Sequence, residues 1–209
     1  MGSILFWVVA LVVVTLLSPL LRVAIALVAG KRIGANALAQ QPDHIHLERC
    51  SPAAWKNGAV PRKVASDLAS RGFEDAGVYA IPEMPGIIVQ LLAHRGEGFY
   101  AALYEHARAG VWLDLVSRFQ DGTSVTYTTS PATALKPRPG HPSVNLRGVE
   151  TLAVFDKARV MRPRRPLTAV SADQAVSVFE ESYAEQIAYR KQVGISTREV
   201  VNTATRKAA

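Results

Sequence analysis

The chain has 209 residues, and its 24 Lys and Arg against 17 Asp and Glu give a formal net charge of +7 at pH 7. Without Arg22, Lys31 and Arg32, which flank an apolar run, 21 basic and 17 acidic residues leave +4, an ordinary solubility charge that gives no reason to expect a nucleic-acid partner. The single cysteine, Cys50, excludes an internal disulfide framework and suits a reducing compartment.

An apolar run begins the chain. Residues 4–17 contain one non-apolar side chain, Thr15, and apolar character continues to Ala29. A bilayer core is about 30 Å thick and needs about 20 helical residues to cross it. Residues 1–32 are therefore predicted to form a single-pass transmembrane signal-anchor.

An apolar run of this kind has two alternatives to an anchor, a secretory signal peptide and a buried core helix. A secretory signal peptide has a basic start and a short apolar core. Residues 1–3 carry no charged side chain, and Lys31 and Arg32 separate the run from Ala37-Leu38-Ala39, which resembles a cleavage site. A buried core helix is disfavoured by 18 successive uncharged residues, 4–21.

Basic residues flank the run on its C-terminal side only, at Arg22, Lys31 and Arg32. Positive flanks stay in the cytoplasm, which predicts a cell-membrane protein with a cytoplasmic globular part. Arg22 lies near the end of the run, where its guanidinium can reach the headgroups, so we interpret it as part of the anchor.

Residues 33–58 are interpreted as a tether and entry segment. A helix is predicted over 61–71, because Val60, Val64 and Leu68 recur at helical spacing and Gly72 supplies a left-handed stop. Phe73 should then pack on Leu68.

Five short runs rich in β-formers follow, and turn residues separate them. Short connections imply antiparallel neighbours. The strands are predicted at residues 77–81, 87–92, 99–104, 111–119 and 123–129. Asp121-Gly122 is the clearest hairpin signal, whereas the alanines of 99–104 also permit a helical turn.

A proline-rich loop is predicted at residues 128–142. Helices are predicted after it, at residues 149–161, 171–193 and 196–206. Ser171 with Gln174 and Ser196 with Glu199 form capping-box patterns. The whole predicts an α+β fold: one anchor helix, then a single domain over 59–209 with a five-stranded antiparallel meander between helices. We expect the helices to cover one face of the sheet.

Possible metal ligands lie close behind the anchor, at His44, His46 and Cys50. Zinc prefers nitrogen and sulfur ligands, but a fourth ligand and the usual spacings are missing. Two exposed histidines and a buried cysteine are the simpler interpretation, and neither a metal nor another cofactor is expected.

Acid–base candidates are Glu83, in the rigid turn Pro82-Glu83-Met84-Pro85-Gly86, and Glu105, His106 and Asp114. Neighbouring strand residues point to opposite faces, so Glu105 and His106 cannot serve one site without a bulge. The sequence has no nucleophile elbow, Walker loop, G-x-G-x-x-G or H-E-x-x-H motif.

The densest basic cluster, Arg159, Arg162, Arg164 and Arg165, lies among prolines and indicates a stiff linker or a contact with acidic lipid headgroups. Two functional hypotheses follow. The first is a non-catalytic binding or scaffolding module that holds a protein partner at the bilayer surface. The second is a membrane-bound hydrolase that uses Glu83 or Glu105 with a histidine.

Overall fold

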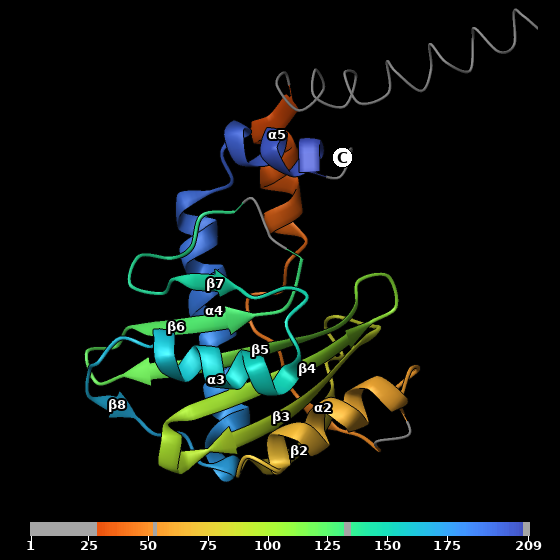
Figure 1. The fold of residues 1–209 in the computed structure, drawn as a ribbon. Helices are drawn as coiled ribbons and strands as arrows, with labels where there is room; N and C mark the ends of the chain where they lie inside the picture. Colours follow the sequence, from red (N-terminus) through yellow and green to blue (C-terminus); the bar gives the residue numbers. More distant parts are fainter. Residues whose placement is uncertain (1–28, 52–53, 132–134, 207–209) are drawn as a thin grey trace, which may run out of the picture. The chain divides into compact units, whose positions relative to one another are not determined.

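The computed structural model describes residues 29–51, 54–131 and 135–206 of the chain (Figure 1). The chain divides into two compact units: a larger unit, Pro42–Ala132 with Pro137–Ile187, and a smaller unit that takes the remaining segments. The sequence predicts one domain over residues 59–209; the last 22 of these residues, 188–209, fall in the smaller unit.

The predicted anchor lies outside the described residues, apart from its flank at 29–32. Of the helices that the structure describes, none combines the length and the apolar character that a membrane crossing requires.

An antiparallel meander of five strands forms the centre of the larger unit, as the sequence predicts. The strands are β2 Glu74–Ala80, β3 Ile87–His94, β4 Phe99–His106, β5 Gly110–Phe119 and β6 Ser124–Thr128. The alanine-rich segment at 99–104 is therefore a strand. The Asp121-Gly122 hairpin is also confirmed: Gly122 has a φ of +79°, and the Asp121 carboxylate accepts a bond from the Thr123 amide at 3.0 Å.

Three short strands that the sequence does not predict extend the sheet. They are β1 Glu48–Arg49, β7 Ser143–Asn145 and β8 Leu167–Thr168. β1 pairs with β2 at one edge, β7 joins β6 in parallel at the other, and β8 pairs with the end of β5.

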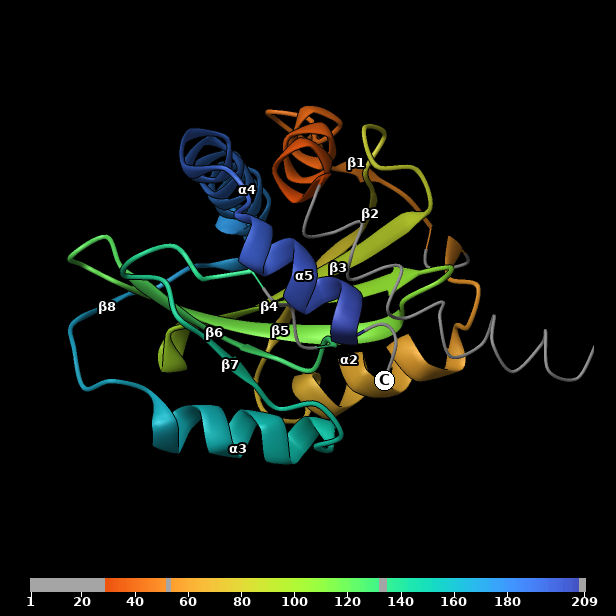
Figure 2. The same cartoon turned by 90° about the horizontal axis from the view of Figure 1, so that it is seen from above.

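Helices α2 Ala59–Ala69 and α3 Thr151–Met161 pack on one face of the sheet (Figure 2). The larger core lies here, and it joins Leu68 of α2 and Phe155 of α3 to alternate side chains of the strands, including Leu103, Leu115 and Tyr127.

Helix α2 ends in a Schellman motif, as predicted. The Phe73 amide donates to the Leu68 carbonyl and the Gly72 amide to the Ala69 carbonyl, with Gly72 at a φ of +90°. Leu68 and Phe73 lie in the same core cluster.

Helix α4 Ala175–Val193 packs on the opposite face, after the 3₁₀ turn η3 Ala172–Gln174, which the predicted Ser171–Gln174 capping box opens. Its Ala175 and Phe179 form a second core with Val89, Leu91 and Ala102 of the sheet. The expectation of one bare face is therefore wrong, because the apolar stripe of α4 covers the second face (Figure 2).

The smaller unit contains a helix over residues 29–39, where the sequence suggested a tether, the end of α4, and α5 Thr197–Arg206. The helix over 29–39 approaches the start of α5 closely: a Cβ at Gly30 would come within 2.9 Å of Thr197, and a Cβ at Gly34 within 2.9 Å of Ile195. Small residues four apart permit such an approach.

A buried ion pair fixes the C-terminal part of this unit. Arg190 lies 3.4 Å from Glu199, and both side chains are 8 % exposed. Burial favours the neutral acid, but bonds from the Lys136 and Ser196 amides, and Arg190, outweigh it and lower the pKa of Glu199 to about 2. Glu199 also completes the predicted capping box with Ser196.

Candidate functional site

The buried carboxylate of Glu105 holds the entry to α2. Its two oxygens accept the amides of Lys56 and Asn57 at 2.7 and 2.8 Å. Both residues precede the first turn of the helix, so Glu105 fixes the backbone of the segment that leads into α2. Its role in this structure is to position α2.

His106 lies at the start of the β4–β5 turn. Its Nδ1 accepts the amides of Arg108 and Ala109, both at 3.2 Å. Strand alternation sends its side chain to the face opposite Glu105, as expected, and the structure does not bring the two together.

The possible metal ligands lie in two separate places. His44 and His46 are exposed on either side of Ile45, which is 2 % exposed, whereas Cys50 packs against the larger core and burial raises the pKa of its thiol. Within the described part of the chain, no three His, Cys, Asp or Glu side chains form a group that would hold a metal ion.

His46 and Glu83 form the one imidazole–carboxylate pair among the sequence candidates. Nδ1 of His46 lies 2.7 Å from Glu83 Oε1, and the His46 amide donates to the other oxygen at 3.1 Å. The hydrogen bond raises the pKa of His46 and lowers that of Glu83. The Pro82–Gly86 turn thus directs the carboxylate of Glu83 toward His46.

A groove of about 420 Å³ lies beside this pair, between residues 44–46 and helix α4. Its lining consists of His44, Ile45, His46, Glu180, Glu181, Ala184 and Glu185. Glu180 accepts the Leu47 amide at 2.6 Å, so a carboxylate of α4 holds the extended segment that carries the histidines. Glu185 pairs with Arg138 at 3.0 Å.

The sequence does not reveal that the three glutamates of α4 belong to this groove, because they are far along the chain from residues 44–47: Leu47 and Glu180, which share a hydrogen bond, are 133 positions apart. The available signal was local: Glu180 lies directly after Phe179 of the apolar stripe, so it borders the buried face.

Asp114 occupies the sheet face beneath α4. It lies on the same face as Val116, two positions along β5, and Val116 packs with Val178 of α4. Burial raises the pKa of Asp114 to about 6, although a hydrogen bond from Thr128 favours its charged form. Its Oδ1 is buried with no hydrogen-bond partner in the described residues, so the ion is poorly solvated.

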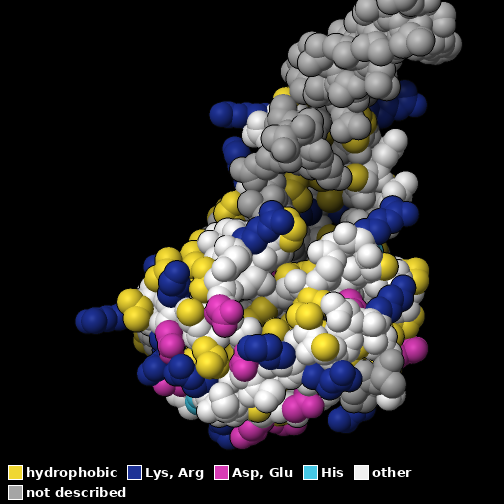
Figure 3. Space-filling view, turned by 45° about the vertical axis from the view of Figure 1, so that its right-hand side comes forward, with side chains coloured by type: hydrophobic (Ala, Val, Ile, Leu, Met, Phe, Trp, Pro, Cys, Tyr) yellow, Lys and Arg dark blue, Asp and Glu magenta, His cyan; other side chains and the backbone are white. Residues whose placement is uncertain are grey.

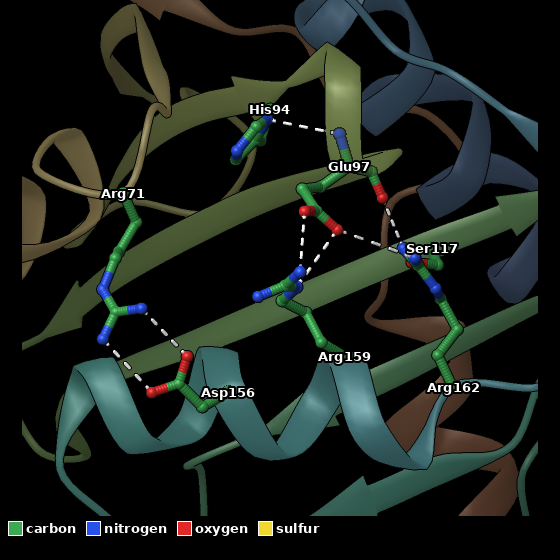
Figure 4. Close-up of polar contacts among 7 residues, drawn as sticks. All are labelled: Arg71, His94, Glu97, Ser117, Asp156, Arg159 and Arg162. Carbon is green, nitrogen blue, oxygen red and sulfur yellow. Dashed lines mark hydrogen bonds and ion pairs between the residues drawn. The ribbon is translucent and has the colours of Figure 1, made fainter.

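The predicted basic cluster binds within the larger unit instead of forming a linker (Figure 4). Arg159 reaches Glu97 at 3.0 Å, and Arg165 reaches Asp121 at 3.3 Å. Arg162 donates to the Glu97 carbonyl and lies 4.5 Å over the Phe99 ring. These contacts fasten the end of α3 to two hairpin turns.

Comparisons with protein-family models, curated proteins and solved structures give no match for this chain. The functional assignment therefore rests on the residues themselves.

Proposed function

We propose that this is a single-pass, membrane-anchored protein whose larger unit is a non-catalytic binding or scaffolding module on the cytoplasmic surface. The anchor rests on the apolar run of residues 4–29, and the orientation rests on Arg22, Lys31 and Arg32. Both follow from the sequence alone.

The observation that carries the binding role is the groove between residues 44–46 and α4. Its lining is supplied by imidazoles, carboxylates and two apolar side chains, with no hydroxyl or thiol nucleophile among these described residues. Glu105 and His106, two further acid–base candidates, accept hydrogen bonds from backbone amides. Binding of a partner uses this surface more directly than catalysis does.

The charge of the groove favours a partner segment that carries Lys or Arg. Three glutamates line it against two histidines, and His46 lies within the field of Glu83, Glu180 and Glu48. Such a surface attracts cationic side chains and rejects anionic ones. We therefore expect a protein partner with a basic segment.

A photo-cross-linking residue at Ala184, inside the groove, tests this proposal in native membranes. One dominant adduct should form there and weaken in Glu181→Lys, which reverses the charge of the lining. The matched control carries the cross-linker at Lys157, an exposed position on α3. Equal adducts at both positions, or an adduct indifferent to Glu181→Lys, would contradict a partner in the groove.

One observation favours a hydrolase as the second candidate. A carboxylate 2.7 Å from an imidazole nitrogen is the arrangement that orients a general base, and an open groove adjoins it. The test is turnover of ester, amide and phosphoester substrates by the purified protein. Activity that His46→Ala abolishes in a folded protein would replace the binding proposal with this one.

A further inference from the structure

The net charge of the chain is concentrated in the smaller unit. The larger unit holds 15 Lys and Arg against 16 Asp and Glu, a net of −1. The described part of the smaller unit holds seven basic residues against the single acid Glu199, a net of +6: Lys31, Arg32, Lys136, Arg190, Lys191, Arg198 and Arg206. Figure 3 shows the Asp and Glu side chains over the larger unit.

Burial removes the one acid from the surface. Glu199 is buried and paired with Arg190, so these two charges compensate each other inside the unit. Among the side chains whose exposure the structure describes in this unit, five basic ones are exposed: Lys31, Arg32, Lys136, Lys191 and Arg198. They come from three segments far apart in sequence, and only folding brings them into one unit.

Large apolar side chains are exposed beside these charges. Ile33 is 40 % exposed next to Arg32, Leu135 is 36 % exposed next to Lys136, and Val193 is 53 % exposed two residues after Lys191. Basic side chains interleaved with aliphatic ones are typical of surfaces that lie in the headgroup region of a bilayer. A nucleic-acid backbone would use the charges but would not bury the aliphatic groups.

The described part of the smaller unit begins at the end of the apolar run, which Lys31 and Arg32 directly follow. Clusters of four to eight Lys or Arg immediately beside a membrane span attract anionic lipids. We propose that the smaller unit is an anionic-phospholipid binding surface, formed jointly by residues 29–39, Lys136, the end of α4, and α5. This rests on the proposed membrane anchor.

Lysine labelling provides the test, because both units carry exposed lysines. The full chain is reconstituted into nanodiscs of neutral phosphatidylcholine, or of the same lipid with about 30 % phosphatidylserine, and amine acylation is followed by mass spectrometry. Labelling of Lys31, Lys136 and Lys191 should slow by about threefold or more in the anionic discs, and about 0.5 M NaCl should reverse the change. Lys56 and Lys157 of the larger unit should be unaffected.

Matched charge reversals strengthen the test. Lys136→Glu with Arg198→Glu should restore rapid labelling of Lys31 and Lys191 in anionic discs. Lys157→Glu with Arg164→Glu, an equal change on exposed positions of the larger unit, should not. Circular dichroism and the unfolding temperature check that each variant folds.

Equal labelling in both lipids would overturn the inference, as would equal protection of the lysines in both units. Protection by duplex DNA in place of anionic lipid would assign the surface to nucleic acid and also overturn it. Retention in neutral discs after a high-salt wash tests the anchor separately. A chain retained there without lysine protection refutes only the lipid surface. A chain lost from neutral discs refutes only the anchor, and labelling on anionic discs still decides the lipid surface.

Discussion

The imidazole of His46 and the carboxylate of Glu83 lie 2.7 Å apart, although 37 positions separate them in the chain. Glu83 also accepts the His46 amide, so one carboxylate fixes both the ring and the backbone of the segment at the edge of the groove. The pair joins a rigid turn to the segment that carries both histidines of the groove. The effect of this pair can therefore be measured as the pKa of the His46 imidazole.

Replacing Glu83 by Gln should lower the pKa of His46, because the variant removes the negative charge that favours the imidazolium and leaves only a neutral amide oxygen as acceptor. The pKa should fall from above its ordinary value of about 6.5 toward that value. NMR titration of the ring protons measures it. His141, whose pKa is lowered by burial and Arg138, is the internal control and should not move. An unchanged His46 titration would mean that the pair does not persist in solution.

Asp114 should make the stability of the larger unit depend on pH between about 4 and about 6. Its pKa is about 6 in the folded chain, against about 3.9 when unfolded, so the folded state binds the extra proton in this range. The free energy of unfolding therefore falls as pH rises, by an amount on the order of 2–3 kcal/mol above pH 6.

Asp114→Asn should remove this component, which denaturant unfolding in mild detergent at several pH values measures. Asp121→Asn is a control of opposite sign. Bonds from Thr123 lower the pKa of Asp121, so its contribution is present above pH 4 and is lost as pH falls. A wild-type curve that Asp114→Asn reproduces would show that this carboxyl is solvated.

Local rules in the sequence predicted much of the fold. The five central strands, the Schellman closure at Gly72 and both capping boxes depend on neighbouring residues, whose spacing is visible in the chain. Strands of two or three residues, such as β1 and β8, are too short to show a period, and long-range pairing creates them. The α4 packing on the second face and the Leu47–Glu180 contact are likewise products of tertiary structure.

The candidate site was only partly predictable for the same reason. The two prolines of the Pro82–Gly86 turn indicate that the carboxylate of Glu83 has a fixed direction, but the sequence does not show which residue it contacts. Glu105 was a candidate acid–base residue because glutamate is a residue type that often acts in proton transfer. Its actual partners, the amides of Lys56 and Asn57, belong to a segment 48 and 49 positions away.

Arg162 should contribute more to stability than Arg71, although each contacts a distant element. The Arg162 side chain is 16 % exposed, donates to Ser117 Oγ at 3.4 Å and to the Glu97 carbonyl, and covers Phe99. Arg71 pairs with Asp156 at 3.0 Å but is 36 % exposed, so solvent screens the pair (Figure 4).

Alanine at 162 should therefore cost about 2 kcal/mol of unfolding free energy, and alanine at 71 about 0.5 kcal/mol. Chemical denaturation of the two variants measures the difference. Because Arg162 fastens α3 to the β3–β4 turn, hydrogen exchange should also rise at residues 95–98 in Arg162→Ala alone. Equal losses in the two variants would mean that burial does not separate these contacts.

Removing residues 1–28 should release a folded, soluble chain, since the apolar run of the predicted anchor ends at Ala29, where the described helix over 29–39 begins. A cut after Arg32, which the sequence alone suggests, should be less stable. It deletes the first turn of that helix and the close approach of Gly30 to Thr197. Fractionation after a high-salt wash shows the release, and thermal unfolding compares the two fragments. A 29–209 fragment that still resists the wash and carbonate would show that the anchor is not confined to residues 1–28. Fragments of equal stability would show that the first turn of the helix does not support the smaller unit.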